Sequence, residues 1–211
     1  GKSPANTPAV VIERKPGEKY EYAPAGYTIV QQVLSDLYNQ PFDKVMEQLI
    51  FNPLRMKHST FSQALSAQDS RDVALPYLPN GKLMPNAPLV YVASASGGLW
   101  TTPTDLAKFV IAIQEALRGH MQAGITQKMV EEMMTPGLDP HMGLGFEVNL
   151  NQYGKRVKKG EYFMHGGFNS GYLAVILGSK KGGNGIVIMV NSAPYMSAEK
   201  VHQYQFLTHV I

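Results

Sequence analysis

The stretch best suited to chemistry is His165-Gly166-Gly167, which interrupts a strand-like apolar run near the C-terminus. The run reads EYFMHGGFNSGYLAVILG over residues 161–178. Glycine inside a strand weakens packing, and a ring that can carry charge is unfavourable to bury. Glycine also lets another molecule come close to the backbone. The pattern therefore indicates that something binds against the backbone of Gly166 and Gly167.

Metal chemistry is not indicated by the remaining candidate ligands. The histidines show no H-x-x-x-H spacing and no carboxylate pairing typical of a metal site; they are His58, His120, His141, His165, His202 and His209. The sequence has no cysteine, which removes disulfides, thiolate catalysis and cysteine-based zinc sites. We expect neither a metal nor a cofactor.

The helices that would position residues 165–167 follow from apolar periodicity. Apolar residues recur at helical spacing from Pro24 to about Tyr38, and again from Pro41 to just before Asn52, where Pro53 stops the helix. A third helix has clearer boundaries, with Thr102 as N-cap, Pro103 next and Gly119 past its end.

The C-terminal third changes to short apolar runs separated by glycine-rich or basic turns, which predict an antiparallel sheet. The runs are GLGFEVNL, EYFMHGG, GYLAVILG and GIVIMVNS. We interpret the basic stretch 154–160 as a solvated hairpin loop. Residues Val201, Tyr204, Leu207 and Ile211 predict a closing helix on the sheet.

Composition places the chain among ordinary globular proteins. Its 211 residues are 44% hydrophobic and 17% charged, with a net charge of +3. No run approaches the ~18 apolar residues of a spanning helix. We expect no nucleic-acid partner and no membrane span. The predicted fold class is α+β, an α/β sandwich with an antiparallel sheet and flanking helices.

Three collinear segments resemble the serine β-lactamase-like family, which includes penicillin-binding-protein-like enzymes. Residues 15–61 resemble its segment with a tyrosine signature, a G-Y helix start and a closing P-L-G-M-x-x-T, with Arg55 in place of the glycine. Residues 94–109, SASGGLWTTPTDLAKF, resemble A-G-G-L-x-S-T-x-x-D-L. HGGFNSGY, 165–172, resembles the third catalytic motif.

The resemblance implies that residues 1–211 form the C-terminal part of one β-lactamase-like domain, incomplete at its N-terminus. The expected sections are the tyrosine motif and helices (15–61), a loop-rich insertion (62–98), a helical part (99–135), and antiparallel strands with a terminal helix (143–211). The polar, proline-containing start, GKSPANTPAV, is typical of a linker within a longer product.

The same resemblance implies a serine hydrolase that acts through an acyl-serine on an ester, D-peptide amide or β-lactam carbonyl of a small-molecule or peptide-like substrate. Tyr22 would transfer protons, and His165, Gly166 and Gly167 would form the edge-strand motif. The N–H of Phe168 would donate to the oxyanion. A tyrosine with a pKa of about 10 needs positive charge nearby to act as a base, which we expect from the family's lysine and from His165.

Two departures from the family pattern bear on the substrate. Pro24 stands where many relatives have an asparagine, and His165 stands where β-lactamases have lysine. A mostly neutral imidazole holds a substrate carboxylate less strongly than an ammonium does, which favours esterase or D-peptide chemistry.

The nucleophile is the larger departure. The only S-x-x-K string, 197–200, follows the other motifs instead of preceding them, and Ser197 is better explained as a helix N-cap. We therefore expect the serine and lysine in a segment before Gly1, which would be a partner of this chain. The alternative is a non-catalytic binding or sensor module. The resemblance also implies a periplasmic or secreted location.

Overall fold

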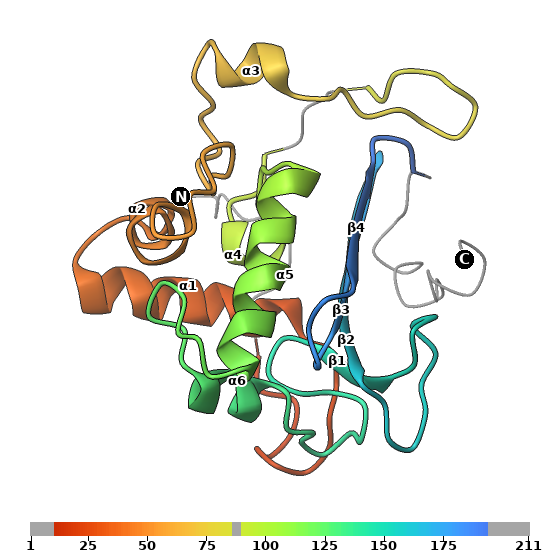
Figure 1. The fold of residues 1–211 in the computed structure, drawn as a ribbon. Coiled ribbons are helices and arrows are strands. Elements are labelled where there is room, and N and C mark those ends of the chain that lie inside the picture. The colour runs from red at the N-terminus through yellow and green to blue at the C-terminus, as the bar shows by residue number, and fades with distance from the viewer. Residues whose placement is uncertain (1–10, 86–89, 194–211) are drawn as a thin grey trace.

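The computed structural model describes residues 11–85 and 90–193. Its helices lie on one side of a four-stranded antiparallel sheet of order β1-β2-β3-β4 (Figure 1). The strands are β1 Glu147–Leu150, β2 Tyr162–Asn169, β3 Tyr172–Ser179 and β4 Gly185–Val190. The expected fold class, α+β with an antiparallel sheet and flanking helices, is confirmed.

The helices are α1 Pro24–Tyr38, α2 Phe42–Met46, α3 Asp69–Asp72, α4 Ser94–Gly97, α5 Pro103–Leu117 and α6 Gln127–Met133. A π-helical turn, Glu47–Phe51, continues α2. The predicted boundaries of α1 and α5 are confirmed. At the start of α5, Thr102 Oγ1 accepts the N–H of Asp105 at 3.2 Å, and past its end Gly119 has a φ of 87°. None of the helices in the described ranges is long and apolar enough to cross a membrane.

Two parts of the sequence prediction differ from the structure. Strand β1 is shorter than the apolar run 143–150, because Gly145 takes a φ of 83° and the pairing with β2 is irregular. The loop-rich segment 62–98 contains the four-residue helices α3 and α4, too short for periodicity to reveal. The predicted closing helix and Ser197 lie outside the described residues.

The core lies between the sheet and the helices α5 and α6. Its fully buried members include Ile113 and Ala116 of α5, Val130 of α6 and Phe163 of β2. The side chain of Gln114 reinforces this contact, because its Nε2 donates to the carbonyls of Ser179 at 3.0 Å and Asn184 at 2.8 Å. The C-terminal half of α5 is thereby joined to the end of β3 and to the turn before β4.

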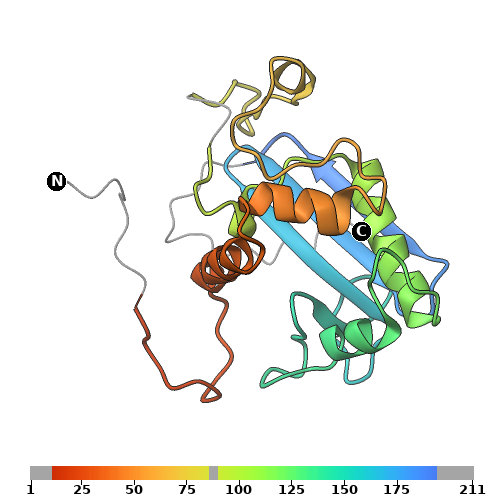
Figure 2. The same ribbon diagram turned by 90° about the vertical axis from the view of Figure 1, so that its left-hand side faces the viewer.

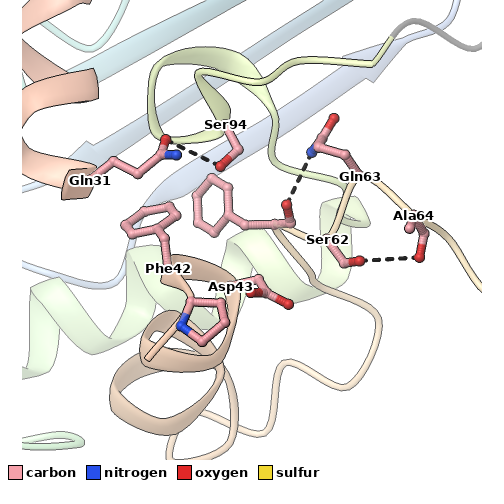
Figure 3. Close-up of a pocket in the computed structure, with 9 residues that line it drawn as sticks. Gln31, Phe42, Asp43, Ser62, Gln63, Ala64 and Ser94 are labelled. Atoms are coloured by element: carbon pink, nitrogen blue, oxygen red, sulfur yellow. Dashed lines mark hydrogen bonds between the residues drawn. The ribbon is translucent and has the colours of Figure 1, made fainter. Parts of the chain in front are cut away.

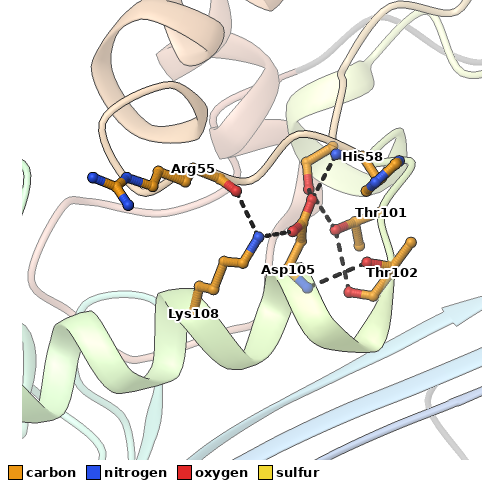
Figure 4. A network of polar contacts seen from close by, with 7 residues as sticks. Arg55, His58, Thr101, Thr102, Asp105 and Lys108 are labelled. Atoms are coloured by element: carbon orange, nitrogen blue, oxygen red, sulfur yellow. Dashed lines mark hydrogen bonds and ion pairs between the residues drawn. The ribbon is translucent and has the colours of Figure 1, made fainter.

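A buried carboxylate joins α5 to the preceding loops (Figure 4). Asp105, 1% exposed, accepts hydrogen bonds from the His58 N–H at 2.7 Å, Ser59 Oγ at 3.1 Å and Lys108 Nζ at 2.6 Å. Burial acts to raise the pKa of Asp105, but the hydrogen bonds from Lys108, His58 and Ser59 outweigh it and hold that pKa below its ordinary value. The loop at 58–59 is therefore held against the first turn of α5.

Candidate active site

Strand β2 carries the two glycines at an open edge of the sheet. It pairs with β3 throughout, but β1 pairs with it only at Tyr162 and Met164. At Gly166 and Gly167 no described strand lies on that side. A Cβ at Gly166 would meet nothing within 4 Å, and one at Gly167 would make only ordinary contacts with Ala174, 3.6 Å away. Packing among the described residues therefore does not require glycine at either position.

His165 precedes these glycines on the side of the sheet that faces the helices. It lies opposite Ile176, which packs into the core beneath α5. Burial lowers the pKa of the half-buried His165, while the Glu147 carboxylate and a hydrogen bond with the Gly166 backbone act in the opposite direction. The imidazole is thus mostly neutral at pH 7. Phe168, opposite Leu173, continues β2 beyond the glycines.

Tyr22 lies in the extended segment that leads into α1 and is 49% exposed. Its partial burial and the neighbouring Tyr27 raise its pKa. The hydroxyl of Tyr27 lies 3.3 Å from where a Cβ of Gly145 would stand, so the start of α1 lies close to the N-terminal end of β1.

Electrostatic neighbours connect this tyrosine segment to β2. Burial raises the pKa of Tyr20, and Tyr22, Asp139 and Glu147 raise it further. The same Glu147 carboxylate acts on His165. Tyr20 and His165 therefore each lie within electrostatic range of the Glu147 carboxylate, at the start of β1.

The expected activation of Tyr22 by His165 is not supported by these pKa directions. A neutral His165 supplies no positive charge, and the pKa of Tyr22 lies above, not below, its usual value. Any role of Tyr22 as a base therefore needs a cation from outside the described residues.

Comparison with known proteins decides the family, because the beta-lactamase family profile matches residues 7–209. The chain belongs to the beta-lactamase family. It is 25% identical over 185 residues to the penicillin-binding protein-like PbpX of Bacillus subtilis (strain 168), and 24% identical over 184 residues to protein flp of Staphylococcus aureus (strain MW2). These matches cover 87% and 85% of this chain but only 46% and 35% of the relatives, so the chain spans less than half their length.

Solved structures share the fold of this beta-lactamase family member. The octameric penicillin-binding protein homologue from Pyrococcus abyssi gives a TM-score of 0.68 at 23% identity, covering 86% of this chain and 41% of that one. D-amino acid amidase from Ochrobactrum anthropi SV3 gives 0.66 at 21%, covering 88% and 53%. A class C beta-lactamase gives 0.64 at 16%, covering 86% and 54%.

Sequence reasoning missed three side chains around the candidate site of this family member. Tyr20 and Glu147 had no signal, because their proximity depends on tertiary contacts between segments over 120 residues apart. Asn169 lies within the third motif, and its Nδ2 donates to the Gly97 carbonyl at 2.8 Å, which ties the end of β2 to α4.

A pocket of about 330 Å³ lies elsewhere, between α1, α2 and the loop at 61–64 (Figure 3). None of the five predicted site residues lines it. Its hydroxyls have intramolecular partners, since Ser94 Oγ donates to Gln31 Oε1 at 3.2 Å and Ser62 Oγ to the Ala64 carbonyl at 3.1 Å. We therefore locate the candidate site at β2 and not in this pocket.

Proposed function

We propose that this chain is the C-terminal part of one beta-lactamase-like domain in a serine hydrolase. The enzyme would form an acyl-serine intermediate with an ester, D-peptide amide or β-lactam carbonyl. Its serine and lysine nucleophile pair would come from polypeptide outside residues 1–211. His165 stands where β-lactamases have a lysine, and this difference favours ester or D-peptide substrates over β-lactams.

One observation carries the proposal: two glycines that packing does not require lie at the open edge of β2, directly after a half-buried neutral histidine. An acyl group could lie against this edge without meeting a side chain at Gly166. The Phe168 N–H would donate to the developing oxyanion, an interaction on the order of 3 kcal/mol. Such an edge is of little use to the fold itself, because it leaves the ladder incomplete.

Tyr22 is the proposed proton-transfer residue, and its raised pKa defines what the rest of the enzyme must supply. A lysine ammonium beside the phenol would lower that pKa by favouring the phenolate. The neutral His165 would then contribute hydrogen bonding instead of charge, either to Tyr22 or to the substrate.

Fluorophosphonate labelling of the longer gene product, with turnover of p-nitrophenyl esters, D-amino acid amides and nitrocefin, tests the proposal. We expect a labelled serine outside residues 1–211 and ester or amide turnover. Tyr22→Phe should lower kcat by about 10²- to 10⁴-fold. Tyr38→Phe, at the exposed far end of α1, is the matched control and should leave kcat unchanged. Absence of both labelling and turnover would contradict the proposal.

A non-catalytic binding module is the second candidate, favoured by Pro24 in place of the family asparagine and by the raised pKa of Tyr22. A binder would take up a D-alanyl-D-alanine peptide in calorimetry and show neither labelling nor turnover. Substitution of Gly167 by Val would abolish that binding, whereas it would abolish turnover in the enzyme.

A further inference from the structure

The β1–β2 and β3–β4 connections, residues 151–161 and 180–184, lie side by side at one end of the sheet. Tyr162 pairs with Ser179, and the Lys180 N–H donates to the Glu161 carbonyl at 2.6 Å. In Figures 1 and 2 both connections lie at the lower end of the sheet. We call the two together the basic end of the sheet. None of the five predicted site residues belongs to it.

The basic end of the sheet concentrates positive charge. The whole chain, with 19 Lys and Arg and 16 Asp and Glu, carries a net charge of +3. The basic end of the sheet carries +5, because six basic residues stand there with Glu161 alone, and the rest of the chain therefore carries −2. The six are Lys155, Arg156, Lys158, Lys159, Lys180 and Lys181. Crowding of like charges opposes folding, so the fold itself does not account for this cluster.

Most of this charge is unpaired. Arg156 forms an ion pair with Glu147 at 3.2 Å, and Lys181 forms one with Glu161. In the described part of the chain the other four have no carboxylate partner: Lys155, Lys158, Lys159 and Lys180. Lys180 is half-buried, and burial lowers its pKa with no carboxylate to offset the effect. An anionic partner would therefore meet ammonium groups that have no counter-charge of their own.

The backbone that carries these lysines is held in place. Asn151 Oδ1 accepts the N–H groups of Tyr153 at 2.9 Å and Lys155 at 3.0 Å. The Val157 N–H donates to the Asn149 carbonyl at 2.9 Å, which folds the connection back along β1. Tyr153 stands in the turn between these contacts and is 51% exposed. Binding at this surface would order side chains more than backbone, which lowers its entropic cost.

We propose that the basic end of the sheet docks on a bilayer that contains anionic lipids. Clusters of about four to eight Lys and Arg are attracted to the negative surface potential of such a bilayer. The exposed Tyr153 suits the same surface, because tyrosine places an apolar ring and a polar hydroxyl at a membrane–water boundary. The contact is peripheral, and it does not depend on the proposed hydrolase activity.

A nucleic acid fits this surface less well. Arginine makes the bidentate contacts typical of phosphate and base recognition, whereas lysine acts as a point charge. The basic end of the sheet has five lysines and one arginine, and that arginine, Arg156, is paired with Glu147. Proteins that bind single strands stack successive bases on several aromatic side chains, whereas the basic end of the sheet contains only Tyr153. A cluster of point charges matches a diffuse anionic surface better.

Co-sedimentation of the 211-residue chain with phospholipid vesicles tests the proposal. Vesicles of phosphatidylcholine and phosphatidylglycerol in about equal amounts are compared with vesicles of phosphatidylcholine alone, at about 0.1 M salt. We expect binding only where phosphatidylglycerol is present. The binding should be lost at about 1 M salt, where the screening length falls to about 3 Å.

Matched variants locate the binding surface. Lys158→Ser combined with Lys159→Ser should weaken vesicle binding about 25-fold, at about five-fold for each lysine. Lys57→Ser combined with Lys82→Ser removes the same charge from two exposed lysines outside the basic end of the sheet, and should leave binding nearly unchanged. Tyr153→Ser should weaken binding several-fold without changing its dependence on salt, because it removes no charge. Circular dichroism checks that each variant keeps its fold.

Four results would overturn the proposal. Absence of binding to both kinds of vesicle would remove the partner, and equal binding to both would remove the role of anionic lipid. Equal weakening by the two double variants would show that net charge acts without a defined surface. Displacement of the chain from vesicles by a DNA duplex at equal phosphate concentration would assign the surface to nucleic acid.

Discussion

Helices α1 and α5 have the same length, and both begin with a proline at the first turn, yet they use their apolar sides in opposite ways. Helix α5 turns its apolar side onto the sheet and buries Val110, Ile113 and Ala116. Helix α1 faces its neighbours with Gln31 and exposes Ile29 and Val33. Amphipathic periodicity thus predicts that a helix has an interface, but not which partner covers it.

The two helices also differ in how their ends are held. The side chain of Thr102 caps α5, and Asp105 joins its first turn to the loop at 58–59. Ala23 provides no side-chain cap for α1. The stability of the described chain should therefore depend on α5 and the sheet, whereas α1 and the open edge of β2 are available for binding. Each of the following predictions tests this difference between the two regions.

The largest contrast in stability is expected between the apolar sides of the two helices. Ile113→Ala should lower the free energy of unfolding by about 3 to 4 kcal/mol, because it leaves a cavity in a site that is 1% exposed. The matched Val33→Ala on α1 should change it by less than about 0.5 kcal/mol in the 211-residue chain. Urea unfolding followed by circular dichroism measures both. Similar losses for the two variants would show that α1 also belongs to the stabilising core.

The next largest effect on stability is expected at the buried carboxylate of Asp105. Asp105→Asn should destabilise the chain by about 3 kcal/mol, because it weakens a buried pair and leaves Lys108 without its counter-charge. Asp36→Asn on α1, whose carboxylate bonds only to the exposed Gln32 among the hydrogen bonds described, is the control and should be nearly neutral. If Asp105→Asn left the free energy of unfolding unchanged, the loop at 58–59 would be held by other contacts.

Two glycines in paired strands compare the packed core of the sheet with the open edge of β2. At Gly178 a Cβ would lie 2.5 Å from the buried Phe163 ring, so Gly178→Ala should destabilise by about 2 kcal/mol through overpacking. Gly166→Ala should be neutral or stabilising by up to about 1 kcal/mol, because the space is open and alanine restricts the unfolded chain. In the longer product it should nevertheless reduce kcat/KM. Equal thermal destabilisation of both variants would make Gly166 a structural glycine.

The sequence predicted those features that depend on local chemistry. Thr102, Pro103 and Gly119 mark α5 through capping and backbone geometry, and short apolar runs separated by glycine-rich or basic turns mark the strands. Helix α4 could not be predicted, because its four residues are held by a side chain from α1, 63 and 64 positions away.

In the candidate site, too, some features were visible in the sequence and others depend on tertiary packing. The glycines at 166 and 167 were visible in the sequence as an unusual pair within a strand-like run, and β2 continues through them. The electrostatic link of Tyr20 and His165 to Glu147, in contrast, arises from tertiary packing. The directions of the pKa shifts of Tyr22 and His165 were likewise hidden, because they depend mainly on burial. The roles of Tyr22, His165, Gly166, Gly167 and Phe168 stay predictions.

The smallest effect concerns acid stability and tests whether the network at α5 is electrostatic. The folded-state pKa of Asp105 lies below its unfolded value of about 3.9, so its stabilisation is complete above that value and is lost as the pH falls towards the folded pKa. Between these two values the unfolded chain binds about one proton more at this site, which adds up to about 1.4 kcal/mol of lost stability per pH unit. Asp105→Asn lacks this group and should show a shallower decline below pH 4 in urea titrations. Parallel curves for the two proteins would indicate that Asp105 holds the loop by shape and hydrogen bonding alone, and not through its charge.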